Sequence, residues 1–533
     1  MTLPEQPPTP RVPWTEVAAT KRSVRDAQIK EQQHVVSTHN DRITSIADIE
    51  HLTRSIKERV LSAEDIVKAY IAKKGKVTGS NLECLLTICF RDAICQAKAL
   101  DEFQRNNGRL IGPLHGVVMS VKDQFNIQGI DSTLGYASRA FKPATSDALM
   151  VQFLKQQGAV VIAKTNLPQS IMWCETENPI FGLTTHPLNA ELTPGSSSGG
   201  EAALLALHGS MVGWGTDIGG SIRIPSHMNG LWGLKPSAAR MSYEGVEVTL
   251  SGQQHVPSAV GPMARSLESL TTVTKAVIEA KLWTLDAQLP PLPWRDEFYG
   301  HYSRRPLVVG TMLDDGAVKV HPSIESVFRS TVSKLKVAGH EIVEWDVSLN
   351  AECIAIMDAY YSADGGEDVR RAVTDGGEPF LPHVQAFINR APSISVYEYW
   401  QLNKRKVKAQ QAYMDLWNRT RSPSGRPVDV LLLPTMPHTA VPHRSCRWVG
   451  YTKLFNFLDY TALSFPAGKA SKDVQNDELS TGYKARNDID AWNWGLYDSD
   501  KMEGHDVGLQ IVGCRFDEEK VLGAALQIES LLK

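Results

Sequence analysis

Apolar residues along this chain occur mainly as short continuous runs, separated by stretches with helical periodicity. The runs at 117–121, 159–163 and 428–433 are rich in valine, isoleucine, leucine and alanine. Runs of this length predict strands that are buried on both faces of a parallel or mixed sheet. Between the runs, apolar positions return every three or four residues, which predicts helices over 92–104 and 323–338. The alternation indicates an α/β fold.

Turn and capping residues predict where several elements begin and end. Ser62, followed by Asp65, predicts the start of a helix. Ser146 predicts the start of another helix, which Gly158 ends. Ser196-Ser-Ser198 stands ahead of a helical run and is also compatible with a simple helix cap. Further strands are expected at 85–90, 211–214, 307–310 and 341–345.

The chain reads as one large domain with an N-terminal extension. Residues 1–45 are polar and begin with many prolines, which predicts an arm that packs loosely on the rest. Residues 46–533 contain no internal repeat, and we expect them to form a single domain. The polar stretch 470–480 is expected to be a surface loop.

Composition and charge exclude several classes of protein. With 42% hydrophobic and 22% charged residues, the chain is neither disordered, collagen-like nor a disulfide scaffold. Its 56 basic and 59 acidic side chains give a net charge of −3, which argues against a nucleic-acid partner. Seven scattered cysteines without C-x-x-C spacing predict reduced thiols. We expect no transmembrane segment and a cytoplasmic location, because no secretory signal or apolar run of 18 residues is visible.

A glycine-rich segment carries the first candidate for chemistry. Gly215-Thr-Asp-Ile-Gly-Gly-Ser-Ile-Arg-Ile-Pro225 follows the predicted strand 211–214. Its paired glycines allow backbone conformations closed to other residues, so that successive N–H groups can form an anion-binding concavity. An oxyanion hole needs such fixed donors. Ser221, at the end of this turn, is placed to attack a carbonyl held there.

Lys122 is the candidate base for that serine, because it ends an apolar strand. A lysine accepts a proton only when it is neutral, and burial can lower its pKa from about 10.4 toward 7–8. Such a shift costs about 3–4 kcal/mol, so the side chain must be buried and tightly held. The simpler alternative is that the glycines form an ordinary turn and that Lys122 is a solvated charge at a strand end.

A second serine motif competes with this interpretation. Gly195-Ser-Ser-Ser-Gly199 matches the G-x-S-x-G nucleophile elbow, which would make Ser197 the nucleophile. That motif requires a strand immediately before it, and here Pro194 precedes the first glycine. The context therefore disfavours the elbow.

Cofactor and metal motifs fit poorly. Gly213-Trp-Gly215 lacks the third glycine of a dinucleotide fingerprint. His438 and His443 form the tightest histidine pair, but Pro442 breaks any helix there, so we expect no metal site. The histidines expected to be structural are His115, His208 and His227.

At these residues the chain resembles the amidase signature family. The resemblance spans about residues 46–533, with a highly specific core at 112–265. Residues 360–366 and 492–494 look most like the fungal acetamidase-type branch, and the core also resembles fatty acid amide hydrolase. The matching segments are Gly112-Pro-Leu-His-Gly116, Val121-Lys-Asp123, Lys164-Thr-Asn-Leu-Pro-Gln-Ser170, Thr193-Pro-Gly-Ser-Ser-Ser-Gly-Gly-Glu201, Gly215–Pro225, Gly233-Leu-Lys-Pro236, Gly261-Pro-Met-Ala-Arg265 and Val507-Gly-Leu-Gln-Ile-Val-Gly513.

The resemblance implies a fold and a set of roles. The family fold is a twisted mixed β-sheet sandwiched between α-helices. By resemblance, Ser221 is the nucleophile, Ser197 is a bridging serine with a cis peptide bond, and Lys122 is the base. The backbone N–H groups of residues 218–221 (Ile218, Gly219, Gly220 and Ser221) would form the oxyanion hole. We expect Asp217 and Arg223 to hold the loop through a charge-assisted bond.

The implied activity is amide hydrolysis through an acyl-enzyme, with no metal or cofactor. In relatives, the residues after Ser170 line the acyl pocket; here these are Ile171, Met172, Trp173 and Cys174. They are bulky and apolar, which favours an aliphatic or aromatic acyl group, although some of them could equally be core. Residues that could border the entrance are Tyr360, Tyr361 and Asp364. Ser196 stands where relatives often carry glycine.

Other functions stay open at the level of the sequence. The same triad serves esterases, and a glutamine-dependent transamidase subunit or a non-catalytic binding protein on the same scaffold would share most motifs. The expected partner is a small-molecule amide substrate. Many members of the family dimerise, so the resemblance also implies that a homodimer is possible.

Overall fold

The structure is a computed structural model that describes residues 12–31, 40–74, 84–474 and 482–533. Its main sheet has 11 strands in the order β1-β3-β2-β6-β8-β7-β12-β13-β11-β9-β10, and β4-β5 form a small second sheet. The strands are β1 (Leu85–Ile88), β2 (Val118–Lys122), β3 (Val160–Thr165), β4 (Glu177–Asn178), β5 (Gly182–Leu183), β6 (Val212–Asp217), β7 (Trp232–Lys235), β8 (Ala259–Ala264), β9 (Val308–Thr311), β10 (Glu341–Glu344), β11 (Val430–Pro434), β12 (Ala462–Lys469) and β13 (Asp506–Val512).

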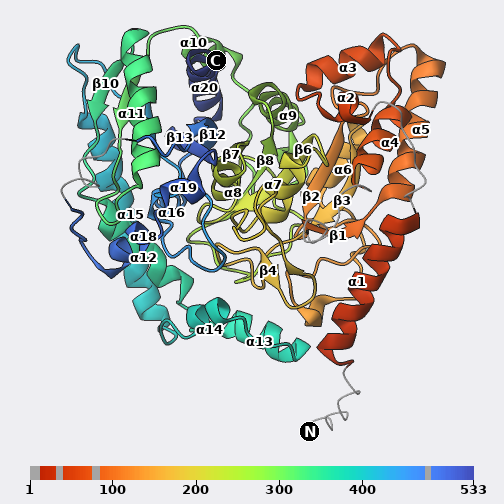
Figure 1. Cartoon of the computed structure of the whole chain (residues 1–533), viewed down its shortest axis with the longest axis horizontal. Coiled ribbons are helices and arrows are strands. Elements are labelled where there is room, and N and C mark those ends of the chain that lie inside the picture. The colour runs from red at the N-terminus through yellow and green to blue at the C-terminus, as the bar shows by residue number, and fades with distance from the viewer. Residues whose placement is uncertain (1–11, 32–39, 75–83, 475–481) are drawn as a thin grey trace.

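Helices from all parts of the described chain surround this sheet (Figure 1). They are α1 (Trp14–Glu31), α2 (Asn40–Thr44), α3 (Ile49–Lys57), α4 (Ala63–Lys74), α5 (Phe90–Asn107), α6 (Leu149–Gln156), α7 (Gly199–Ala206), α8 (Arg223–Met228), α9 (Leu267–Glu279), α10 (Asp296–Tyr302), α11 (Pro322–Val337), α12 (Asn350–Tyr361), α13 (Glu367–Gly376), α14 (Pro382–Ile388), α15 (Val396–Arg419), α16 (Gly450–Phe457), α18 (Asp488–Trp494), α19 (Ser499–Met502) and α20 (Glu518–Leu532).

The sheet is mixed, as predicted. β2 pairs in parallel with both β3 and β6, and β9 pairs in parallel with β10 and β11. The middle strands β6, β8, β7, β12, β13 and β11 run antiparallel to their neighbours in that order. The predicted α/β sandwich is therefore confirmed.

The strands are buried on both faces, which explains their continuous apolar runs. In β11, Val430 and Leu432 belong to one core cluster, whereas Leu431 and Leu433 belong to another. The first cluster includes residues of α3 to α6, α9 and α20, and the second includes residues of α12, α14, α15 and α16. Alternate side chains of one strand thus enter two helical layers, as the pleat of a strand requires.

The expected loose packing of the N-terminal arm is wrong for α1. Arg22 Nε of α1 donates to the carbonyl oxygen of Ile180 at 2.6 Å, and Lys21 forms an ion pair with Asp131 at 2.6 Å. These bonds fix the helix along the body of the molecule, at the lower right of Figure 1. Loose packing is also wrong for α2, since Ile43 is buried in the main core cluster. Residues 1–11 and 32–39 lie outside the described residues, and the division at residue 45 stays a prediction.

The predicted caps fare differently. The Ser62 cap is confirmed, because its hydroxyl accepts from Asp65 N at 3.0 Å. The Ser146 cap is wrong: α6 begins at Leu149 with Ala148 at the cap position and no side-chain cap. Ser198 occupies the cap position of α7 without a cap hydrogen bond, because its hydroxyl donates to the carbonyl of Thr216 at 3.5 Å.

Most differences in the predicted strands are small shifts of their ends. β6 is longer than the predicted 211–214, and β1 ends at Ile88 because α5 begins at Phe90. The periodicity did not predict β7, β8, β12 and β13. β7, β8 and β13 overlap the glycine-containing motifs at 233–236, 261–265 and 507–513. Part of the expected loop at 470–480 lies outside the described residues.

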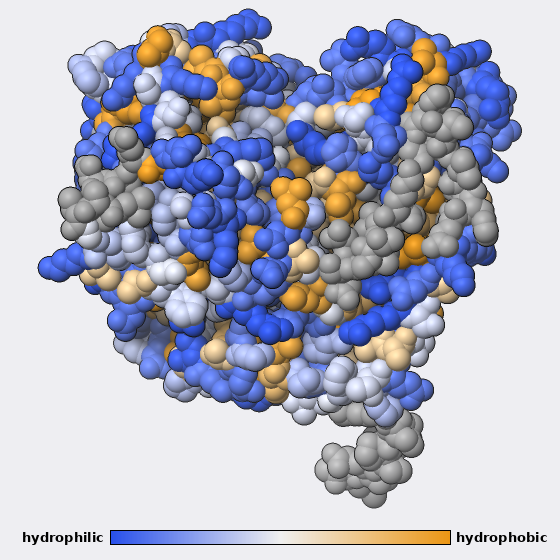
Figure 2. Space-filling model, in the orientation of Figure 1, coloured by the Kyte–Doolittle hydropathy of each residue, from blue (hydrophilic) through white to orange (hydrophobic). Residues whose placement is uncertain are grey.

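None of the helices in the described ranges is long and apolar enough to cross a membrane. On the face seen in Figure 2, hydrophobic residues form separate groups among hydrophilic ones.

A buried ion cluster ties α20 to the segment after β7. Arg240 Nε donates to Glu518 at 3.0 Å, and its Nη2 donates to Glu519 at 2.6 Å. All three side chains are almost fully buried. Burial raises the pKa of the Glu518 carboxyl, and the Arg240 charge opposes that rise. Removing the arginine would leave the buried Glu518 carboxylate without the cation bonded to it, whereas Glu519 would keep its ion pair with Arg295.

We therefore predict that Arg240→Met lowers the free energy of unfolding by about 3–5 kcal/mol, the usual cost of breaking a buried ion pair. Urea unfolding followed by circular dichroism measures it. The matched control is Arg329→Met, which removes the exposed pair with Glu325 on α11 and should cost at most about 1 kcal/mol. Equal midpoints for the two variants would contradict the prediction.

Candidate functional site

Lys122 is the centre of the site. It is the last residue of β2, and no part of its side chain is exposed. Its Nζ donates to Ser197 Oγ at 2.6 Å and to Thr216 Oγ1 at 3.0 Å. The Thr216 hydroxyl donates onward to Gln124 Oε1 at 2.6 Å, so its lone pairs remain directed at the lysine. The structure thus differs from the simpler expectation of a solvated strand-end lysine.

The surroundings favour the neutral form of this lysine. Burial lowers the pKa of Lys122 from 10.5 to about 7, although the charges of Asp217 and Glu201 oppose the shift. The Glu201 carboxylate is itself held by the hydroxyls of Ser120 and Thr165, at 2.5 and 2.6 Å. A substantial fraction of Lys122 is therefore unprotonated near neutral pH.

Ser197 and Ser221 lie on neighbouring loops. The Ser196–Ser197 peptide bond is cis. Ser198 N donates to the carbonyl oxygen of Ser221 at 3.1 Å, which joins the two loops directly. Ser221 is 9% exposed and lines a cavity, whereas Ser197 is more deeply buried behind it. Among the described residues, no hydrogen bond joins the two hydroxyls in this conformation.

The segment before Ser197 does not have the geometry of a nucleophile elbow. Residues 193–195 form no strand, and Ser197 Oγ is bound to Lys122. Ser221, in contrast, follows β6 directly through the turn at 218–220.

Asp217 and Arg223 fix the two ends of that turn. The Asp217 carboxylate accepts from Arg223 Nη2 at 3.0 Å and from the backbone N–H of Ile222 at 3.1 Å. Arg223 also donates to Gln510 at 3.0 Å and to Asn456 at 2.7 Å. Burial by itself raises the pKa of Asp217, but the Arg223 guanidinium outweighs it and holds the pKa well below its usual range. The expected charge-assisted bond is present, with both side chains fully buried.

Two hydroxyl groups orient the peptides of the turn. Tyr361 donates to the carbonyl oxygen of Ile218 at 2.6 Å, and Thr452 donates to that of Gly219 at 2.7 Å. In a trans peptide the N–H points opposite to the carbonyl. The Gly219 N–H therefore points away from Tyr361, and in the described chain no acceptor takes the N–H groups of Ile218, Gly219 or Ser221.

Gly220 differs from the expected role of an oxyanion donor. Its N–H already donates to Asp217 Oδ1 at 2.8 Å. Its φ of +133° lies in a region that L residues with side chains rarely adopt, and a Cβ there would collide with the Thr452 hydroxyl. The residue therefore serves the turn by its conformation.

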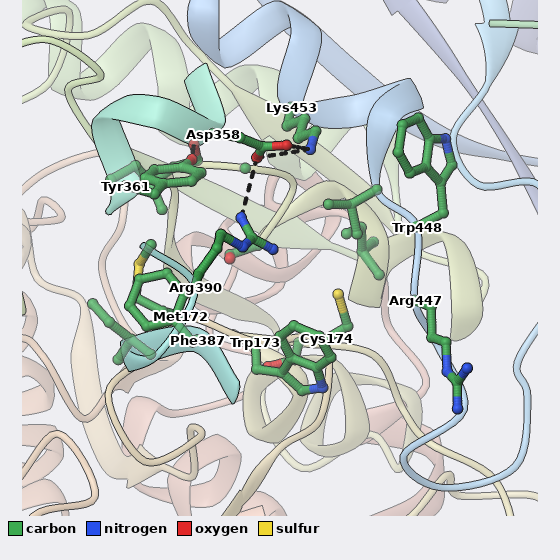
Figure 3. Close-up of a pocket in the computed structure, with 17 residues that line it drawn as sticks. Met172, Trp173, Cys174, Asp358, Tyr361, Phe387, Arg390, Arg447, Trp448 and Lys453 are labelled. Atoms are coloured by element: carbon green, nitrogen blue, oxygen red, sulfur yellow. Dashed lines mark hydrogen bonds and ion pairs between the residues drawn. The ribbon is translucent and has the colours of Figure 1, made fainter. Parts of the chain in front are cut away.

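Ser221 opens into a cavity of about 120 Å³ that is shown in Figure 3. One wall is formed by the predicted substrate-binding residues, in the segment 171–174 that comes after β3 in the chain, and by Ser196. Another wall comes from α12, α14 and α16. The lining residues are Ile171, Met172, Trp173, Cys174, Ser196, Ile218, Gly219, Ser221, Ile224, Asp358, Tyr361, Phe387, Arg390, Arg447, Trp448, Val449 and Lys453.

Some of the other residues that the sequence indicated as candidates lie outside this cavity. Of the three candidates for the entrance, Tyr361 lines the cavity, but Tyr360 and Asp364 line a separate pocket. His227 is buried between the carbonyl oxygens of Gly508 and His438. No cluster of three metal-ligating side chains occurs in the part of the chain that the structure describes.

Several residues of the site were not predicted. Thr216 lies inside the glycine-rich motif and Gln510 inside the motif at 507–513. The sequence therefore identified the two segments but did not predict what either side chain does. Thr452, Asn456 and the charged residues of the cavity carry no motif. They reach the site only because α12, α14 and α16 pack against it.

Comparisons with known proteins agree with this geometry. A family model described as Amidase matches residues 65–522. A protein named Amidase 1 from Gibberella moniliformis is 60% identical over 97% of this chain and 99% of its own length. An acetamidase from Emericella nidulans is 33% identical over 97% of this chain and 98% of its own. A solved fatty acid amide hydrolase superposes with a TM-score of 0.86 at 30% identity, covering 99% of this chain and 91% of that one.

The family match covers most of the chain, and the similar proteins extend over nearly all of it. The expected resemblance is thus confirmed, and with it the reaction class, cleavage of an amide C–N bond. This chain is an enzyme that belongs to the amidase signature family.

Proposed function

We propose that this amidase hydrolyses a small or hydrophobic carboxylic amide through a Ser221 acyl-enzyme, with Ser197 and Lys122 completing the triad. The observation that carries the proposal is the 2.6 Å contact between Lys122 Nζ and Ser197 Oγ, made by a lysine whose pKa is lowered to about 7 by burial. A base that is neutral near pH 7 is what a serine nucleophile requires.

In the first half-reaction, neutral Lys122 takes the proton of Ser197 while Ser197 takes the proton of Ser221. The Ser221 oxygen attacks the amide carbonyl, and the tetrahedral oxyanion accepts from the N–H groups of Ile218, Gly219 and Ser221. Preorganised donors of this kind stabilise charge that develops in the transition state. The proton then returns through Ser197 to the leaving nitrogen, and the C–N bond breaks.

In the second half-reaction, water attacks the Ser221 ester. Lys122 again accepts the proton through Ser197, and its return to Ser221 Oγ releases the carboxylic acid. The same residues thus act as base and as acid, which suits an amide because its amine leaves only when protonated.

The cavity supports an apolar acyl group next to the nucleophile. Ile171, Met172, Trp173 and Phe387 provide its apolar wall. The buried hydroxyl of Ser196 has no hydrogen-bond partner within the described chain, so it is available to a polar atom of the substrate. The same relay would also cleave an ester. A cytoplasmic location and a homodimer stay predictions.

Ammonia release from a panel of primary amides, from acetamide through aryl and long-chain acyl amides, tests the proposal. We predict that Ser221→Ala lowers turnover by roughly 10⁴-fold or more, because the nucleophile is lost. Ser530→Ala, at an exposed position of α20, should leave the rate unchanged. If Ser221→Ala retained the wild-type rate, the nucleophile would be assigned wrongly. A higher rate on matched esters would favour an esterase.

The pH profile tests the role of Lys122. Its protonated form cannot accept a proton, so kcat/KM for an uncharged amide should rise with pH through about 7 and level off above it. Labelling of Ser221 by a fluorophosphonate should show the same limb, because it needs only activation of the serine. A flat profile between pH 5 and 9, or full activity in Lys122→Arg, would overturn the role.

Tyr361 is predicted to act as a positioning residue. Tyr361→Phe removes the bond to the Ile218 carbonyl and should lower kcat about 10-fold with little change in KM for a short amide, because the oxyanion donors lose orientation. The matched control is Tyr360→Phe, since that hydroxyl donates to Asn403 at 2.8 Å. Equal kinetics in the two variants would contradict the prediction.

A further inference from the structure

The cavity contains charged groups that the hydrolytic mechanism does not use. Asp358 of α12 accepts from Lys453 of α16, with Nζ at 2.9 Å from each carboxylate oxygen. Arg390, which follows α14, lies 3.5 Å from the same carboxylate. Figure 3 shows the Arg390 side chain among the lining residues, reaching toward Asp358. One carboxylate thus faces two cations.

Lys453 already has its counter-ion in this arrangement. Its Nζ is equidistant from both oxygens of Asp358 and also lies 5.2 Å from the ring centre of Trp448. Arg390 makes only one long contact, and in the described chain no other side-chain acceptor lies within hydrogen-bond distance of its guanidinium. Most of its five N–H donors remain unused.

Among the described residues, no acid other than Asp358 forms an ion pair with Arg390. Asp217 is paired with Arg223, and Glu177 with Arg444. Arg447, the third cation of the lining, stacks on Trp492 at 3.3 Å and points away from Asp358 in Figure 3. The lining therefore holds three cations and the single carboxylate of Asp358. Arg390, whose side chain is 44% exposed, shares that carboxylate with Lys453 and contacts it only at 3.5 Å.

A guanidinium in this state is a receptor for a carboxylate. Its planar fork donates two parallel bonds to the two oxygens, and charge-assisted bonds are stronger beside an apolar wall than in open water. Here Met172, Trp173 and Phe387 provide such a wall. The lysine next to the arginine adds to the positive potential.

The charged group is also connected to the catalytic turn. Lys453 Cβ would lie 3.9 Å from a side-chain carbon built on Gly219, and its neighbour Thr452 binds the Gly219 carbonyl. One lysine side chain and one carboxylate therefore separate the turn from Arg390. A short acyl chain held at Ser221 can extend toward the guanidinium along this wall.

We propose that the preferred substrate is an amide that also carries a carboxylate, such as a monoamide of a short dicarboxylic acid, and that Arg390 binds this carboxylate. This inference rests on the proposed amide hydrolysis at Ser221. Arg390 is a specificity-determining residue, since it contacts a remote part of the substrate and takes no part in proton transfer.

Matched substrate pairs test the inference. Succinamate and glutaramate are compared with 4-methylpentanamide and 5-methylhexanamide, in which an isopropyl group replaces the carboxylate. Arg390→Gln should lower kcat/KM about 10- to 100-fold for the two anionic amides, mainly through KM, and change it less than about 2-fold for the neutral ones. Arg390→Lys should retain part of the preference.

The control variant is Arg447→Gln, which removes a cation of the same lining that faces Trp492 and should leave the ratio of anionic to neutral rates unchanged. Thermal unfolding of each variant confirms that it is folded. An equal loss on both classes of substrate in Arg390→Gln, or a wild-type enzyme that prefers the neutral amides, would overturn the inference.

The outcome separates this inference from the proposed function. Turnover of the neutral amides with no effect of Arg390→Gln on the ratio would leave the amidase mechanism intact and refute the carboxylate site. If no amide is turned over, calorimetry of succinamate with Ser221→Ala decides. Binding that is lost in Ser221→Ala/Arg390→Gln supports the site, and absence of binding refutes it.

Discussion

The burial of the Lys122 amino group is the constraint on which the rest of the site depends. An ammonium group in this position would be desolvated, and this burial lowers the pKa of Lys122 to about 7. The fold can bury this amino group because Nζ has two hydrogen-bond partners, the hydroxyls of Ser197 and Thr216. The burial of this strand on both faces is therefore what would allow Lys122 to act as the base in the proposed mechanism.

A second constraint is the rigidity of the turn that presents Ser221. Asp217 and Arg223 hold its ends, and Arg223 is held in turn by Asn456 of α16 and Gln510 of β13. These partners come from the C-terminal half of the chain, more than 200 residues away. The turn that presents Ser221, the proposed nucleophile, is thus held by contacts between distant parts of the chain, as a preorganised oxyanion site requires.

The sequence predicts those parts of the fold and site whose cause is local. Continuous apolar runs identify β2, β3 and β11, and the Gly219-Gly220-Ser221 turn follows from the conformations that only glycine adopts. The predicted Ser146 cap is wrong because the preference of serine for the cap position is only statistical, and tertiary contacts decide where α6 begins. The donation of the Gly220 N–H to Asp217 could not be predicted either, since it depends on where Arg223 and Thr452 meet the turn.

The two walls of the cavity differ in the same respect, because one is built from neighbouring motifs of the sequence and the other from distant segments. The residues of the proposed triad lie in one stretch of the chain, from β2 to the turn before α8. Asp358 and Lys453, in contrast, belong to α12 and α16, and Arg390 follows α14. In the proposed mechanism the first group cleaves the bond and the second contacts only the remainder of the substrate. A change in the second group would then alter which amide is bound and leave the proposed relay from Ser221 to Lys122 intact. Since Arg390 shares the carboxylate of Asp358 with Lys453, the proposed carboxylate site depends on this second group and not on the residues of the proposed relay.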